Sequence, residues 1–208
     1  MKFVCLSDTH CLHEQFKIPG GDVLLHAGDF TMIGKEEKIT DFSNFLGSLP
    51  HKYKVVIAGN HDLLFERNPT QAQKLLKNCI YLEDSSVEIE GIKIYGSPWQ
   101  PWFFDWAFNL QRGEEIRKKW DLIPADTDVL VTHGGPWGHG DVVQGKGSQG
   151  CEDLLNRIRN LKIKYHVFGH IHEGYGITKE GMTTCINASN VDVKYAPINK
   201  AIMFELIK

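Results

Sequence analysis

The sequence predicts an α/β protein in which two β-sheets pack face to face and helices cover both outer faces. Apolar segments of strand length, rich in β-branched residues, alternate with segments of helical periodicity, as in sheets of largely parallel strands. The hairpin pattern "SSVEIEGIKIYGSPW" and two strand-like segments near the end of the chain add antiparallel strands. The number of strands is too large for one simple open sheet in a chain of 208 residues. Two sheets packed against each other fit this number better.

The expected elements follow one another in a regular order along the chain. The core strands are short apolar segments at 3–6, 22–27, 54–58, 128–132 and 165–169. Helical periodicity covers 35–49, 70–77, 112–120 and 152–161. The hairpin turns at Glu90 and Gly91, and the last two strands are "MTTCINAS" and "KAIMFELI".

Composition is that of an ordinary globular protein. Hydrophobic residues make up 42% and charged residues 24%, without repeats or a long linker, so we expect one domain over residues 1–208. The net charge of −3 and the lack of a Lys/Arg stripe argue against an extended nucleic-acid surface. The sequence leaves the oligomeric state open.

Cysteine usage and the start of the chain indicate a cytoplasmic protein. The five cysteines are scattered without CxxC spacing, which is typical of reduced thiols. The start "MKFVCLSDTH" is interpreted as a strand because its apolar run is too short for a signal peptide. No apolar run approaches the ~20 residues that span a bilayer, so we expect no membrane partner.

Each of the five core strands ends in side chains that bind metal ions in other proteins. Ligands of open α/β sheets bind beyond the carboxyl ends of the strands, so these residues would converge on one site. One such strand end is more often a turn or a cap, but five in chain order indicate a common centre. The candidate ligands are Asp8, His10, Asp29, Asn60, His133, His170 and His172, with His61 and Asp62 following Asn60.

The spacing of these residues supports convergence. Asp8 and His10 lie two residues apart, as do the histidines of "GHIH", so in extended backbone each pair points to one side. Asn60 and His61 are neighbours that would point to opposite sides, which indicates different roles.

The donor set favours two divalent ions over one. Two carboxylates, four imidazoles and one carboxamide are too many for one tetrahedral zinc, but they suit two ions that share a bridging carboxylate. Mixed nitrogen and oxygen donors favour Mn²⁺, with Fe and Zn²⁺ as alternatives. Two such ions, two carboxylates and a bridging hydroxide leave a charge of about +1, which would attract a phosphate ester.

Together, these motifs resemble the calcineurin-like metallophosphoesterase superfamily. The family pattern reads here as Asp8-Thr9-His10, Gly28-Asp29, Gly59-Asn60-His61-Asp62, His133 in "VTHGGP" and Gly169-His170-Ile171-His172. The segments "HAGDFTMIG", "YGSPWQPWFFDWAFNL", "FGHIHEGYG" and "CINAS" are similar to one branch, the small metallophosphoesterase-domain proteins associated with cyclic nucleotide phosphodiester hydrolysis. The resemblance spans nearly the whole chain and implies a four-layer αββα sandwich of two mixed sheets.

The resemblance also implies a role for each residue. Asp29 would bridge two ions, and His61 would donate a proton to the leaving oxygen, with Asp62 orienting its ring. The other ligands would divide between a first ion, held by Asp8, His10 and His172, and a second, held by Asn60, His133 and His170.

The expected function is hydrolysis of phosphodiester bonds in small nucleotides, cyclic ones by resemblance. A hydroxide between the two ions would attack phosphorus, and His61 would act as the acid. A phosphomonoesterase, a nuclease at the same site and a non-catalytic metal-binding scaffold remain as alternatives.

Residues around the centre are candidates for substrate contacts. "WQPWFFDWAF" holds six aromatics in ten residues, and Trp99 or Phe104 either stacks on a nucleobase or pins this loop to the core. Arg112 either binds a phosphate or caps the next helix, and His139 and Asn60 are further candidates.

Overall fold

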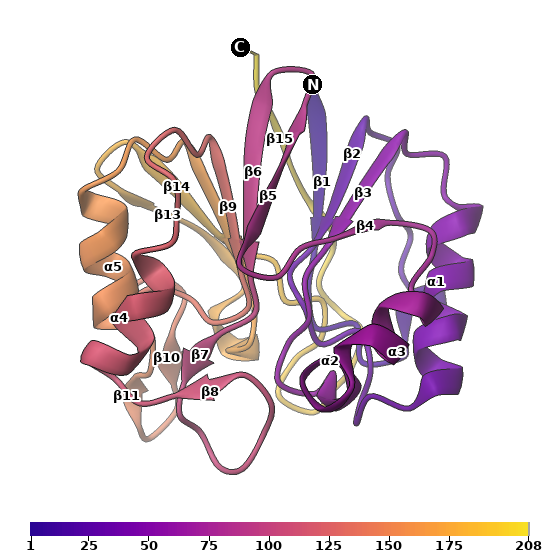
Figure 1. Ribbon diagram of the computed structural model, residues 1–208, viewed down its shortest axis with the longest axis horizontal. Coiled ribbons are helices and arrows are strands. Elements are labelled where there is room, and N and C mark those ends of the chain that lie inside the picture. The colour runs from indigo at the N-terminus through magenta and orange to yellow at the C-terminus, as the bar shows by residue number, and fades with distance from the viewer. Residues whose placement is uncertain (208) are drawn as a thin grey trace.

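The protein, seen in a computed structural model that describes residues 1–207, has four layers (Figure 1). Two β-sheets stand side by side in the centre, with a helical layer outside each, which confirms the predicted αββα sandwich. Outside the first sheet lie α1 (Glu36–Ser48), α2 (Leu63–Arg67) and α3 (Pro69–Leu75). Outside the second sheet lie α4 (Glu114–Trp120) and α5 (Glu152–Arg159).

The first sheet has five strands in the spatial order β15-β1-β2-β3-β4. Its strands are β1 (Lys2–Leu6), β2 (Val23–His26), β3 (Tyr53–Val56), β4 (Ile80–Tyr81) and β15 (Ile202–Glu205). They pair in parallel except for β15, which runs antiparallel to β1. The carboxyl ends of β1, β2 and β3 therefore share one edge, the lower one in Figure 1.

The second sheet has six strands in the order β13-β14-β12-β9-β6-β5, parallel in the middle and antiparallel at both edges. Its strands are β5 (Ser85–Ile89), β6 (Ile92–Ser97), β9 (Val129–Thr132), β12 (Tyr165–Phe168), β13 (Gly176–Glu180) and β14 (Thr183–Asn187). Two small ladders lie near its carboxyl ends and pair β7 (Gln100–Pro101) with β8 (Asn109–Leu110) and β10 (Val142–Val143) with β11 (Gly147–Ser148).

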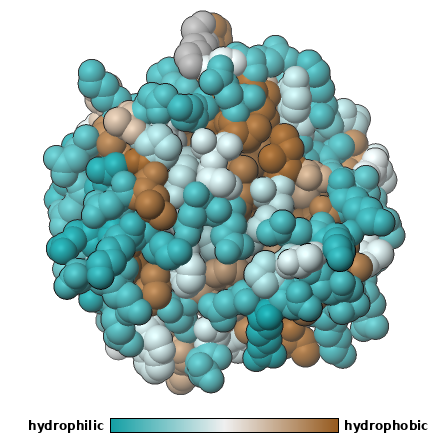
Figure 2. All heavy atoms as spheres, in the orientation of Figure 1, coloured by the Kyte–Doolittle hydropathy of each residue, from teal (hydrophilic) through white to brown (hydrophobic). Residues whose placement is uncertain are grey.

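Three apolar clusters fill the spaces between the layers. The first joins the inner faces of the sheets and includes Leu25 and Val131. The second packs α1, α2 and α3 onto the first sheet, with Phe42 at its centre, and the third packs α4 and α5 onto the second, with Ile158. The face of the molecule seen in Figure 2 is mostly hydrophilic, with apolar patches between the polar side chains. Among the described residues, no helix combines the length and apolar character needed to cross a bilayer.

The predicted helices and core strands are confirmed, within a few residues at their ends. The short elements α2, β4, β7, β8, β10 and β11 were not predicted, because two to five residues carry too little periodicity. Strand β13 was also missed, since "GITKE" is a largely exposed edge strand with one apolar side chain. Two 3₁₀ turns, His13–Gln15 and His172–Gly174, complete the fold.

The inter-sheet packing is tight at Gly96 of β6. A Cβ atom added here would lie 2.5 Å from Leu82 Cβ and 2.7 Å from Ile57 Cγ2. We expect Gly96→Ala to lower the free energy of unfolding by about 1–3 kcal/mol through overpacking, measured by urea denaturation. The control is Gly20→Ala, where the added atom meets nothing of the described chain within 4 Å. Equal stability of the two variants would contradict this packing.

Candidate functional site

The candidate ligands meet where the carboxyl ends of both sheets come together. Asp8, Asp29 and Asn60 follow β1, β2 and β3, whereas His133 and His170 follow β9 and β12 of the second sheet. Neither sheet alone supplies the whole cluster. Ligand atoms that lie within 4.8 Å of one another form three overlapping groups: Asp8, His10 and His172; His10, Asp29 and His61; Asp8, Asp29 and His133.

Left-handed backbone, and not strand alternation, aims these side chains. Asp8 has φ 53°, His10 φ 41°, Asp29 φ 55° and His170 φ 68°. The expectation of extended backbone at the paired ligands is therefore wrong, although the side chains still converge. Non-glycine residues rarely adopt this conformation, and those that do cluster at functional sites.

Two buried carboxylates form the middle of the cluster. Asp8 accepts the His170 N–H at 3.1 Å, and Asp29 accepts the His61 N–H at 2.8 Å. Burial alone would raise the pKa of both carboxyl groups. The histidines around them, led by His172 at Asp8 and by His133 at Asp29, hold each pKa below its ordinary value.

Four imidazoles are oriented by backbone carbonyl groups. The Nδ1–carbonyl pairs are His10–Thr31 at 3.3 Å, His61–Met32 at 2.8 Å, His133–Ala27 at 2.9 Å and His172–Asp192 at 3.1 Å. Because a carbonyl oxygen only accepts, we assign the proton to Nδ1 in each ring. In this neutral tautomer Nε2 carries a lone pair. A neutral imidazole with a free lone pair is the form that binds a metal ion.

The inward Nε2 atoms face other acceptors. His10 Nε2 lies 3.4 Å from His172 Nε2, and His133 Nε2 lies 2.8 Å from Asn60 Oδ1 and 3.3 Å from Asp29 Oδ2. Burial lowers the pKa of His10 to about 4, so His10 stays neutral. At His172 burial opposes ionisation, but Asp8 raises the pKa, so a proton on that ring can bridge the two nitrogens where no other cation is bound. At His133, burial opposes ionisation, but the Asp29 charge raises the pKa to about 9, so the ring takes up a proton where no other cation balances that charge. The donor set therefore fits divalent cations.

The Asp62 carboxylate joins three loops. It does not contact the His61 ring, because the Nδ1 atom of that ring forms its hydrogen bond with the Met32 carbonyl. The expected orienting role of Asp62 is therefore wrong. Its carboxylate accepts four hydrogen bonds of 2.8–2.9 Å, from the N–H groups of Gly59, Asp29 and Thr31 and from the Thr31 hydroxyl. Burial, and then the charge of Asp29, raise the pKa of Asp62 to about 7, and these donors oppose that shift.

A cavity of about 270 Å³ opens beside the cluster. Asp29, Asn60, His61, His170 and His172 form its floor, so a bound molecule would touch the candidate ligands directly. Its other walls carry the exposed rings of Trp102 and Phe103, the basic residues Arg112 and Lys146, and Tyr195.

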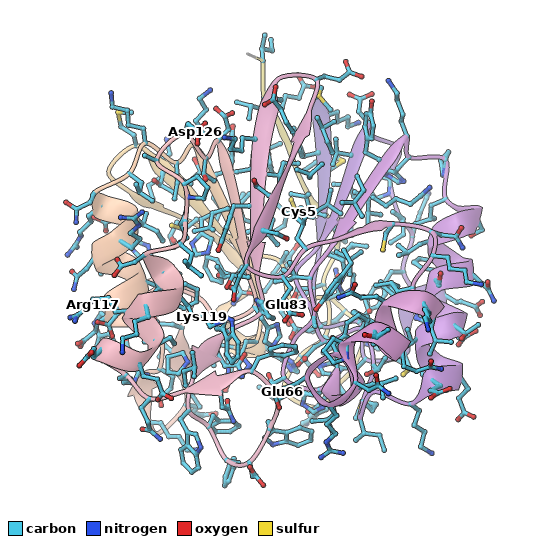
Figure 3. All side chains as sticks on the ribbon, viewed as in Figure 1. Cys5, Glu66, Glu83, Arg117, Lys119 and Asp126 are labelled. Atoms are coloured by element: carbon cyan, nitrogen blue, oxygen red, sulfur yellow. The ribbon has the colours of Figure 1, made fainter. Side chains whose placement is uncertain are left out.

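Trp99 does not line this cavity. Its Nε1 donates to Asp84 Oδ2 at 2.9 Å, and Lys119 Nζ lies 4.3 Å from the centre of its ring. Lys119, labelled in Figure 3, reaches from α4 toward the segment after β4, where Glu83 is also labelled. Trp99 therefore pins its loop to the core, as one of the two sequence interpretations held.

Phe104 and His139 also lie off the cavity wall. Phe104 is 61% exposed and packs edge-on against Phe103. His139 is nearly buried, with Nδ1 2.9 Å from Thr178 Oγ1 and Nε2 3.1 Å from Glu180 Oε2. Neither residue lines the cavity, so their expected substrate contacts stay predictions that this cavity does not support.

Arg112 lines the cavity, and its guanidinium is already engaged. Nη1 donates to the Gly150 carbonyl at 2.6 Å and Nη2 to the Gln149 carbonyl at 2.8 Å. The residue that caps α4 is Gly113, so Arg112 fastens the glycine-rich segment to the wall instead of capping the helix. The wall residues Trp102, Phe103, Lys146 and Tyr195 were missed, and only the density of aromatics at 99–108 hinted at the first two.

The two-sheet fold and its Asp/His/Asn cluster define a class of protein, the metallophosphoesterases, which hydrolyse phosphoric esters with divalent metal ions. Residues 1–174 match the calcineurin-like phosphoesterase family, and the chain belongs to that family. The sequence is 47% identical to human metallophosphoesterase domain-containing protein 1 over 230 residues, which covers 99% of this chain and 71% of the human protein.

Solved structures share the fold at low identity. TT1561 of Thermus thermophilus superposes with a TM-score of 0.61 at 13% identity, covering 98% of this chain and 97% of that one. A structure described as a novel archaeal phosphodiesterase superposes with a TM-score of 0.51 at 16% identity, covering 98% and 100%. At these identities the likeness supports the fold alone.

The four acceptor contacts of Asp62 yield a stability prediction. In Asp62→Asn the amide nitrogen replaces one acceptor oxygen, which leaves buried donors unpaired. We expect a loss of about 2–5 kcal/mol in the free energy of unfolding and lower bound metal, measured by urea denaturation and elemental analysis. Asp41→Asn, at a half-exposed carboxylate on α1, is the control and should leave both nearly unchanged. An unchanged Asp62→Asn protein would show that these loops do not depend on the carboxylate.

Proposed function

We propose that the chain is a metal-dependent phosphodiesterase that hydrolyses small nucleotides, cyclic ones among them, and that residues 1–208 act as one metallophosphoesterase domain. One observation carries the proposal. Lone pairs of the inward Nε2 atoms and the oxygens of Asp8, Asp29 and Asn60 face one another, and part of this cluster, including Asp29 and Asn60, lines a cavity. Divalent cations would balance these acceptors without the extra ring proton that Asp29 otherwise favours on His133, and bound cations would draw an anionic ester into the same cavity.

We infer that two divalent ions bind here, Mn²⁺ first, with Fe or Zn²⁺ as alternatives. Asp29 lies within reach of both histidine groups and would bridge. When bound, the ions would lower the pKa of water and neutralise charge on the phosphoryl oxygens. Asp8, His10 and His172 would hold one ion, and Asn60, His133 and His170 the other.

His61 is suited to protonate the leaving oxygen. Its Nδ1 is fixed on the Met32 carbonyl, its ring packs 4.2 Å from the Trp106 ring, and the residue lines the cavity. This leaves Nε2, 4.0 Å from Asp29 Oδ2, as the atom that holds and delivers a proton. The fixed ring keeps that atom in place during the reaction, which is the requirement for a general acid.

The cavity favours a small substrate with a flat organic group. A volume of about 270 Å³ suits a nucleotide better than a folded protein segment. Trp102 and Phe103, 57% and 41% exposed, offer faces on which a nucleobase can stack. With Arg112 engaged by two carbonyls, the wall lacks the row of free cations that a long nucleic acid requires.

A substrate panel tests the function. We expect Mn²⁺-loaded protein to hydrolyse 2′,3′- or 3′,5′-cyclic nucleotides faster than linear dinucleotides and monoesters, and a chelator to abolish turnover until Mn²⁺ is restored. Product release by chromatography is the measurement, repeated with Fe²⁺ and Zn²⁺. Faster monoester hydrolysis would establish a phosphomonoesterase instead, and no hydrolysis with any metal would leave a metal-binding scaffold.

The role of His61 yields a prediction that depends on the leaving group. We expect His61→Ala to retain its metal ions and to lose turnover of alkyl phosphodiesters by roughly 10²–10⁴-fold. With p-nitrophenyl esters the loss should be much smaller, since that leaving group needs no proton. Steady-state kinetics on both ester classes, with metal content measured on the same samples, make the comparison. An equal loss on both classes would exclude His61 as the acid.

A further inference from the structure

One aromatic residue of the cavity wall, Tyr195, lies outside every motif in the sequence. It belongs to the irregular segment between β14 and β15. Its ring packs edge-on against His10 and His172, with centroids 4.8 Å and 5.3 Å away. Phe103 packs against another imidazole, with its ring 6.0 Å from that of His170, so the two aromatic residues of the wall contact different histidines of the centre.

The backbone of Tyr195 is in a costly conformation. Its φ is 60°, in the left-handed region, where a bulky side chain is an outlier that costs on the order of 1–3 kcal/mol. Asp8, His10, Asp29 and His170 share this feature. Such strain persists only where surrounding contacts impose it, and it gathers at sites where a side chain must point in one direction.

Asp192 builds the turn that imposes this conformation. Its Oδ1 accepts the N–H groups of Lys194 at 2.8 Å and Ala196 at 2.9 Å, and its carbonyl accepts the Tyr195 N–H at 2.9 Å. The same carbonyl accepts His172 Nδ1–H at 3.1 Å. One peptide group thus orients an imidazole of the centre and fixes the residue that covers it.

The base of this segment is fastened to the end of β1. Asn190 N–H donates to the Ser7 carbonyl at 2.8 Å, and the Ser7 N–H donates to Asn190 Oδ1 at 3.2 Å. Ser7 directly precedes Asp8, so these two hydrogen bonds tie the segment to the strand end that carries the carboxylate. Tyr195 is therefore held in place relative to the centre before any ligand arrives.

Packing alone does not explain a tyrosine at this position. A phenylalanine would cover His10 and His172 equally well, whereas a tyrosine adds a hydroxyl donor to a residue that lines the cavity. Within the described part of the chain, the Tyr195 hydroxyl makes no hydrogen bond, and the residue is 38% exposed. The hydroxyl is thus available to a molecule bound in the cavity.

We propose that Tyr195 is a substrate-contacting residue whose hydroxyl donates a hydrogen bond to a non-bridging oxygen of the phosphoryl group at the centre. This inference rests on the proposed function. The two walls of the cavity then have different tasks. Tyr195 meets the charged oxygens, and Trp102 and Phe103 meet the organic group of the ester.

The test compares Tyr195→Phe with wild type in the Mn²⁺-loaded protein. Inorganic phosphate is the binding probe, its Kd is measured by calorimetry, and bis(p-nitrophenyl) phosphate is the kinetic substrate. Removing a hydrogen bond to an anion should weaken phosphate binding and lower kcat/KM by roughly 10–100-fold, with metal content unchanged. The control is Tyr165→Phe, whose hydroxyl donates to the Glu205 carbonyl at the opposite end of β12, and which should behave as wild type.

The outcomes separate this inference from the function on which it rests. Equal phosphate affinity and equal kcat/KM in Tyr195→Phe and wild type would overturn the contact, with hydrolysis intact. Loss of metal in Tyr195→Phe would also overturn it, because the residue would then support the centre and not the substrate. A wild-type protein that binds phosphate but hydrolyses no ester would refute the proposed function, and the binding comparison would still decide the contact.

Discussion

The burial of two carboxylates among imidazole lone pairs is the constraint on which the rest of the site depends. Asp8 and Asp29 are almost without solvent contact, and a buried charge without a partner is strongly destabilising. Backbone carbonyls hold one proton of each of four rings on the outer nitrogen, so in the neutral rings the inner nitrogens face the carboxylates as acceptors. Either a second proton, as Asp29 favours on His133, or a bound cation balances this cluster, so metal binding would displace ring protons and add to the stability of the fold.

The cluster can exist only where the two sheets meet. The first sheet supplies both carboxylates and Asn60, the second supplies His133 and His170, and the apolar layer between the sheets sets the distance between the two halves. Glycine is required at the closest approaches. A Cβ atom at Gly59 would overlap Asp29 Oδ1, and one at Gly169 would overlap Asp8 Oδ2. The apolar packing between the sheets therefore sets the distances between the candidate metal ligands.

The sequence predicted the layers and the meeting of the candidate ligands because both follow from local pattern. A core strand that ends abruptly in Asp, Asn or His is visible without a structure, and parallel pairing brings such ends together. The turns that aim the side chains were not predictable, because left-handed φ at Asp8 or His170 is imposed by contacts between distant segments. The cavity wall was misassigned for the same reason. Trp99 and Trp102 look alike in sequence, yet one is pinned by Asp84 and the other faces the cavity.

The carbonyl of Asp192 connects the centre with the substrate wall. It accepts hydrogen bonds from the His172 ring and from the Tyr195 N–H. Because both donors share one oxygen, the position of one donor limits where the other can lie. An ion bound to the opposite nitrogen of His172 would polarise that ring and strengthen its hydrogen bond to the carbonyl. A loaded centre would therefore hold the turn, and the ring of Tyr195 with it, more firmly. Cations that attract a phosphoryl group would thus also tighten the cavity wall proposed to receive it.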